Sequence, residues 1–124
     1  VEIHGRPASE DPAVRQKLAQ FSIECTAITY NMFRSFSKRL KGNPPGPEGS
    51  VNKLLGSELN MRLAMFATEL LGPYAQLTQG SPHTVDNGRW PRAALWYRLL
   101  TIGGGTSEIQ KNILGDRVLG LPKG

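Results

Sequence analysis

The fold of this chain is decided by residues 99–114, LLTIGGGTSEIQKNIL, which predict the end of one helix, a joint of three glycines and the start of another helix. Thr106 suits the N-cap position of the second helix, because its hydroxyl can accept a hydrogen bond from a backbone N–H of the first turn. Glu108 places a negative charge near the positive end of that helix dipole. We expect this helix to span residues 107–119, ahead of a glycine and a proline that end it.

The three glycines at residues 103–105 leave two interpretations open. Consecutive glycines let a ligand approach free backbone N–H groups, so the joint could hold the polar or anionic edge of a cofactor. It could also be only a flexible connection between two helices. The residues alone favour the plain connection, because no strand precedes the glycines as it does in a nucleotide-binding fingerprint.

Residues 11–40 predict a long helix, since Asp11 can cap its start and Pro12 suits the first helical position. Apolar side chains recur along it every three or four residues, which indicates one buried face. Cys25 lies on this face, so we expect it in the core and not as a nucleophile. The residues of the predicted face are Val14, Leu18, Phe21, Cys25, Ile28, Met32 and Phe36.

Residues 42–47, GNPPGP, cannot continue a helix and predict a sharp turn. The next helix, over residues 49–71, is therefore expected to run antiparallel to the first one and to stop at Gly72 and Pro73. Residues 74–88 lack periodicity and predict a long loop.

A short helix is predicted over residues 90–102, and no segment alternates apolar and polar residues with period two. The chain is therefore predicted to be all-α, an antiparallel up-and-down helical bundle. Its 124 residues are enough for one domain, residues 1–124.

The composition bounds the function. The net charge of +5 raises the question of nucleic acid, but the densest basic cluster, within residues 34–41, sits at a helix C-terminus, where cations complement the dipole. No membrane span is predicted, because no run approaches about 18 apolar residues. The single cysteine fits a reducing, cytoplasmic location. His4 and His83 lie far apart without partnering cysteines, so we expect no metal site.

Two stretches, IGGGTSEIQ at residues 102–110 and RVLGLP at residues 117–122, resemble the closing signature of the acyl-CoA dehydrogenase family. Similar residues occur over most of the chain, at 5–15, 47–58 and 70–73, and the middle stretch is similar to a bacterial branch of the family. The resemblance implies the C-terminal helical domain of a longer protein, with the first helix of the bundle upstream of Val1.

Members of this family carry FAD and are commonly oligomers. The resemblance puts Gly105, Thr106 and Glu108 against the flavin nucleotide. It also puts Glu69 and Gly72 near the adenosine half of FAD bound to a neighbouring subunit.

The family removes the α proton of an acyl-CoA thioester and transfers a hydride to flavin, which requires a carboxylate base. Many relatives carry that base at the position of Gly104, and glycine cannot act as one, so no catalytic residue is assigned here. The expected function is the C-terminal domain of an FAD-dependent acyl-CoA dehydrogenase in lipid degradation, inactive as this segment alone. The alternatives are a non-catalytic scaffold subunit of a heteromeric acyl-CoA dehydrogenase and an acyl-CoA oxidase-type relative. The partners implied are acyl-CoA, further dehydrogenase subunits and electron-transfer flavoprotein; nucleic acid is not expected.

Overall fold

Helices dominate the computed structural model, which describes residues 1–3 and 5–122. Within these residues the α-helices are α1 (Pro12–Leu40), α2 (Glu48–Leu71), α3 (Arg89–Trp96) and α4 (Ser107–Arg117). Short 3₁₀ turns lie at Ala8–Glu10, Gly72–Gln76, Val85–Gly88 and Leu99–Thr101. Two short strands, β1 (Glu2–Ile3) and β2 (Arg6–Pro7), pair antiparallel ahead of α1.

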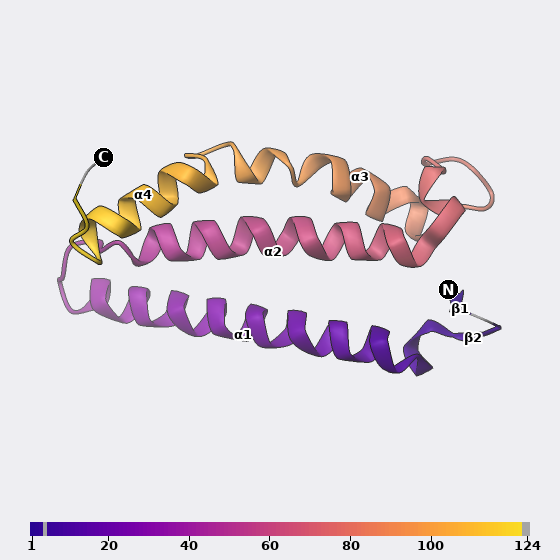
Figure 1. Cartoon of the computed structure of the whole chain (residues 1–124), viewed down its shortest axis with the longest axis horizontal. Coiled ribbons are helices and arrows are strands. Elements are labelled where there is room, and N and C mark those ends of the chain that lie inside the picture. The colour runs from indigo at the N-terminus through magenta and orange to yellow at the C-terminus, as the bar shows by residue number, and fades with distance from the viewer. Residues whose placement is uncertain (4, 123–124) are drawn as a thin grey trace.

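The helices form three layers with α2 in the middle (Figure 1). The helix α1 lies along one side of α2, and α3 followed by α4 lies along the other side. The chain direction reverses between α1 and α2 and again between α2 and α3. The predicted all-α class and antiparallel arrangement are therefore confirmed.

The start of α1 follows from its first residues. The Asp11 carboxylate accepts hydrogen bonds from the backbone N–H groups of Ala13, at 2.8 Å, and Val14, at 3.1 Å. These are two of the orphan donors that every helix N-terminus carries, and Pro12 has no N–H to leave unsatisfied. The helix expected over residues 11–40 thus begins at Pro12.

Three kinds of contact hold α1 against α2. The rings of Phe21 and Phe66 lie 5.7 Å apart in a tilted arrangement, which suits the aromatic quadrupole. The Asn31 amide donates to the Asn52 side-chain oxygen over 2.8 Å. The third contact is a forked ion pair in which the Arg62 guanidinium donates to both carboxylate oxygens of Glu24.

Part of the face predicted to be buried on α1 is exposed. Val14 and Phe21 are buried, but Met32 is 55% exposed, Phe36 is 61% exposed, and Cys25 is exposed as well. The prediction of Cys25 in the core was therefore wrong for this chain. The reason is that α2, the helix packed against α1, covers only part of this face: the contacts with α2 come from Phe21, Glu24 and Asn31.

The helix predicted over residues 90–102 ends earlier, at Trp96, and a 3₁₀ turn follows at Leu99–Thr101. Here the Leu99 carbonyl accepts from the N–H groups of both Ile102, at 3.1 Å, and Gly103, at 2.7 Å. The next carbonyl, that of Leu100, accepts instead from a lysine of α2. The chain between α3 and the glycines therefore winds into a tighter 3₁₀ turn.

Other boundaries also differ from the expectation: α2 begins at Glu48 and α3 at Arg89, each one residue before the predicted start. The last helix ends at Arg117 and not at residue 119, because the Leu114 carbonyl accepts from both Val118 and Leu119. The loop expected over residues 74–88 contains most of one 3₁₀ turn and the whole of another.

Candidate functional site

We call residues 103–108, which comprise the end of the joint after α3 and the first residues of α4, the glycine corner. Gly104 has φ +70° and Gly105 has φ +96°, values that L side chains rarely adopt. A Cβ at Gly105 would lie 2.6 Å from the Gln110 side-chain nitrogen, whereas a Cβ at Gly104 would meet only Lys53 Cε, at 4.0 Å. The corner therefore requires glycine at residue 105 and leaves open space beside residue 104.

Thr106 starts α4 as predicted. Its hydroxyl oxygen accepts from the Ile109 N–H at 3.3 Å, and its carbonyl accepts from the Gln110 N–H at 2.9 Å. These bonds satisfy first-turn donors and fix the direction in which the chain leaves the glycines.

Glu108 is exposed in the first turn of α4. Its carboxylate accepts a hydrogen bond from its own backbone N–H and another from the Thr106 hydroxyl, and both lower the pKa of this carboxyl below its usual range. At neutral pH the corner therefore presents an ionised carboxylate with further capacity to accept hydrogen bonds.

Two side chains hold the backbone of the corner from inside. The buried amide of Gln110 donates to the Gly104 carbonyl over 3.1 Å. The Lys53 ammonium donates to the Leu100 carbonyl over 2.9 Å and to the Gly105 carbonyl over 2.5 Å. Sequence reasoning gave Lys53 no role in the joint, because a lone lysine on a helix resembles a solvated side chain until the helices are packed.

Glu69 and Gly72 lie elsewhere, at the far end of α2. Glu69 is exposed, and Gly72 ends the helix with φ +54°, its N–H donating to the Glu69 carbonyl. A helix rises about 1.5 Å per residue, so Lys53 and Glu69 stand about 24 Å apart along α2. The fold brings Gly105, Thr106 and Glu108 together and keeps Glu69 and Gly72 apart from them.

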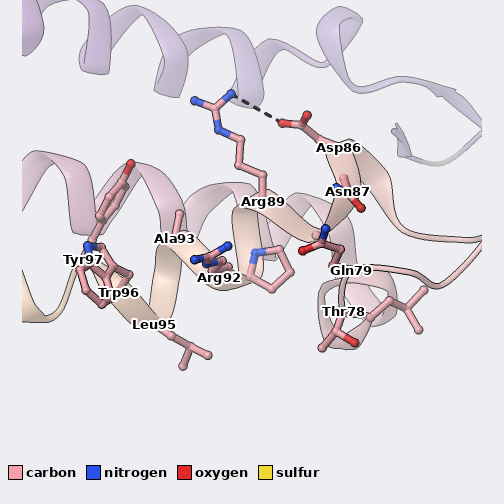
Figure 2. A pocket seen from close by; sticks show the side chains of 13 residues that line it. Thr78, Gln79, Asp86, Asn87, Arg89, Arg92, Ala93, Leu95, Trp96 and Tyr97 are labelled. Atoms are coloured by element: carbon pink, nitrogen blue, oxygen red, sulfur yellow. Dashed lines mark ion pairs between the residues drawn. The ribbon is translucent and has the colours of Figure 1, made fainter.

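An open cleft of about 860 Å³ lies between residues 77–79, the turn at residues 86–88 and α3 (Figure 2). Figure 2 shows Arg89 reaching toward Asp86, and the two side chains are 3.7 Å apart and both well exposed. None of the five residues predicted to contact a cofactor lines this cleft. We therefore place the candidate site at the glycine corner.

Among the described residues, no group of three or more His, Cys, Asp or Glu side chains could hold a metal ion. His83 is exposed in the loop before α3, and His4 lies outside the described residues. No helix in the described part of the chain is long and apolar enough to cross a membrane.

Comparison with known families matches residues 2–119 to the family described as acyl-CoA dehydrogenase, C-terminal domain. Acyl-CoA dehydrogenase FadE26 of Mycobacterium tuberculosis is 35% identical over 96 residues, which cover 77% of this chain and 24% of that protein. Acyl-CoA dehydrogenase IpdE1 of Mycolicibacterium smegmatis is 34% identical over 119 residues, which cover 94% of this chain and 27% of that protein. The chain thus spans about a quarter of the length of these curated relatives.

Solved structures share the fold. A chain in the crystal structure of the ChsE4–ChsE5 complex from Mycobacterium tuberculosis superimposes with a TM-score of 0.84 at 29% identity, over 99% of this chain and 32% of that one. The structure described as the Tcur3481–Tcur3483 steroid ACAD gives a TM-score of 0.84 at 22% identity, over 94% of this chain and 30% of that one. The helical arrangement is therefore that of a larger protein's domain in each case.

Proposed function

Because this chain belongs to the acyl-CoA dehydrogenase family, in which it matches the C-terminal domain, we propose that the complete protein is an FAD-dependent acyl-CoA dehydrogenase of lipid degradation. In this proposal the glycine corner forms part of the FAD site. The observation that carries it is the geometry of the corner, where an exposed backbone at Gly104 leads into a helix start whose first turn carries the Glu108 carboxylate. The family resemblance predicted from residues 102–110 is confirmed.

The residues of the corner suit a dinucleotide. Gly104 is exposed, and only Lys53 Cε, at 4.0 Å, lies near the place where a side chain would begin, so a flat or polar group can approach this backbone closely. Glu108 can accept hydrogen bonds from hydroxyl or amino groups, and the Thr106 hydroxyl already donates to that carboxylate. When bound, FAD supplies the acceptor for the hydride that leaves the acyl thioester.

The corner supplies no base for removal of the α proton. Gly104 has no side chain, and the hydrogen bonds that lower the pKa of Glu108 make its carboxylate a weaker base. We propose that the base belongs to a part of the protein outside residues 1–124, or to a partner subunit. The role of this chain is then to bind and orient the cofactor and to pack the domain.

The proposal is tested on the complete protein by measuring bound FAD and its dissociation constant. Glu108→Ala is expected to weaken FAD binding at least tenfold, since it removes a preorganised acceptor. Glu10→Ala removes an exposed glutamate outside the corner and is expected to leave binding unchanged. A complete protein that binds no FAD, or a Glu108→Ala variant that binds it normally, would overturn the proposal.

The absence of a basic side chain at Gly104 also favours a second function, that of a non-catalytic scaffold subunit in a heteromeric acyl-CoA dehydrogenase. The complete protein would then reduce an electron-accepting dye with acyl-CoA only after a catalytic partner subunit is added. Turnover by the complete protein alone would contradict the scaffold role. Hydrogen peroxide in place of dye reduction would identify an oxidase-type relative.

Further parts of the proposal concern partners. We propose that the exposed apolar side chains of α1, Met32 and Phe36 among them, are covered by an upstream helix in the complete protein. Other dehydrogenase subunits, with Glu69 and Gly72 near a neighbouring subunit's FAD, and electron-transfer flavoprotein are proposed partners. A cytoplasmic location stays a prediction from the single cysteine.

A further inference from the structure

One side chain reaches the glycine corner from another layer of the fold. Lys53 stands on α2, the middle layer, and its ammonium donates to the carbonyls of Leu100 and Gly105, at 2.9 and 2.5 Å. These carbonyls flank the three glycines, one before them and one at their end. A single cation therefore binds both ends of the joint. We call this pair of hydrogen bonds from Lys53 the clamp.

We propose that Lys53 is the positioning residue of the corner: it sets where Thr106 and Glu108 stand relative to α2, and through them the affinity for the cofactor. The effect on affinity rests on the proposed FAD site, whereas the clamp itself does not. Lysine suits this task because an ammonium carries three donors on a long stem and has no acceptor of its own.

The clamp acts where the backbone is least constrained. Three consecutive glycines have more conformational freedom than any other tripeptide, and ordering them costs correspondingly more free energy. Gln110 also restrains the corner through the Gly104 carbonyl, but Gln110 belongs to α4 and moves with it. Lys53 ties the joint to a separate helix.

The environment strengthens these bonds. Lys53 is half-buried, and hydrogen bonds from a charged donor are roughly twice as strong as neutral ones. The Leu100 carbonyl belongs to the last turn before the glycines, where carbonyls lack intrahelical partners and carry partial negative charge. Loss of the ammonium would leave two carbonyls without their donor.

The experiment compares three variants of the complete protein with the wild type. Lys53→Met removes the charge and the donors but keeps most of the apolar stem. Lys53→Arg keeps a charged donor. Lys41→Met removes an exposed lysine at the C-terminal end of α1, outside the joint, and serves as the matched control.

Two quantities are measured for each variant: amide hydrogen exchange in the peptide that covers residues 99–108, and the dissociation constant of FAD. We expect Lys53→Met to speed exchange in that peptide at least tenfold and to weaken FAD binding at least tenfold. Lys53→Arg should restore most of the wild-type exchange rate and FAD affinity, and Lys41→Met should match the wild type in both.

The outcomes separate the inference from the proposed function. Exchange at residues 99–108 that is equal in Lys53→Met and Lys41→Met overturns the clamp, whatever happens to FAD. If Lys53→Met shows faster exchange but unchanged FAD affinity, while Glu108→Ala weakens FAD binding, the link between the clamp and the cofactor is overturned. Absence of FAD binding in the wild type overturns the proposed function and leaves the clamp to be judged by exchange.

Discussion

Among the described residues, two turns place consecutive residues at positive φ, and they are held in different ways. In the glycine corner, Gly104 and Gly105 take the positive values, and a cation from α2 binds the carbonyls around them. In the turn before α3, Asp86, Asn87 and Gly88 have φ of 49°, 52° and 71°. That turn is held by close packing against the backbone of residues 77–79.

The contacts of the second turn are local. Gly88 is buried, and a Cβ there would lie 3.0 Å from the Gln79 backbone nitrogen. The Arg89–Asp86 pair beside it is exposed at 3.7 Å (Figure 2). An exposed pair of this kind contributes little, so close backbone packing maintains the turn. Steric packing thus holds the 86–88 turn, whereas a cation from another helix holds the glycine corner.

The largest effect is expected from Gly88→Ala. The new Cβ would be forced into a left-handed conformation and against a backbone atom that cannot move aside like a side chain. We expect this domain to lose about 3 kcal/mol of stability, measured by native-state hydrogen exchange on the complete protein. Gly80 has φ +95° and open space around a new Cβ, so Gly80→Ala controls for the cost of placing alanine in a left-handed backbone conformation. Equal losses in the two variants would contradict the packing argument.

A smaller loss, about 2 kcal/mol, is expected from Gly105→Ala. Its Cβ would displace the Gln110 amide, which is the end of a flexible side chain and can move at the cost of its bond to the Gly104 carbonyl. The same exchange measurement on Gly105→Ala, Gln110→Ala and the double variant tests this. The double variant should lose less than the sum of the single losses, because both changes break the same bond. Additive losses would show that the displaced amide is not the cause.

Acid should weaken the α1–α2 contact and leave both turns in place. Arg62 and then Gln20 hydrogen-bond the Glu24 carboxylate and lower its pKa from 4.5 to about 2. A lowered pKa stabilises the folded chain above the ordinary value, and the contribution disappears as pH falls from about 4.5 to about 2. Because the Arg62 side chain is 45% exposed and the pair is screened, we expect a loss of about 1 kcal/mol.

Hydrogen exchange of α1 peptides in the complete protein, followed between pH 5 and pH 3, measures this loss after correction for the intrinsic exchange rate. Glu24→Gln removes the titrating group and should flatten the pH dependence of α1. A Glu24→Gln protein with the wild-type pH dependence would exclude this ion pair as the origin.

The smallest effect is expected from Arg89→Ala. It removes the exposed pair with Asp86 and should change stability by less than about 0.5 kcal/mol. Thermal unfolding of the complete protein with and without 0.5 M salt measures it. A loss comparable to that of Gly88→Ala would mean that charge, and not packing, maintains the 86–88 turn.

Much of the fold could be predicted because its signals are local. Asp11, Pro12, Gly72 and Thr106 mark helix ends through contacts within a few residues, and the structure has a helix boundary at each. The face of α1 could be predicted as apolar but not as buried, since burial depends on what packs against it. Met32, Phe36 and Cys25 lie on that apolar face and are exposed.

The residues of the candidate site also include some that could be predicted and one that could not. Gly105, Thr106 and Glu108 adjoin in sequence, so their proximity could be predicted. Lys53 joins them across 52 residues of sequence, and nothing in its own neighbourhood indicates that it does. A long-range contact of this kind exists only once α2 and the joint are packed.

By itself, the sequence determined the helix starts, the turns and the all-α class, because capping, proline and glycine act on the backbone over a few residues. Only the tertiary structure decided which apolar faces are covered and which cation holds the glycine corner. Those outcomes depend on the relative placement of helices far apart in the chain, where burial and hydrogen bonding are properties of the packed layers and not of any one segment.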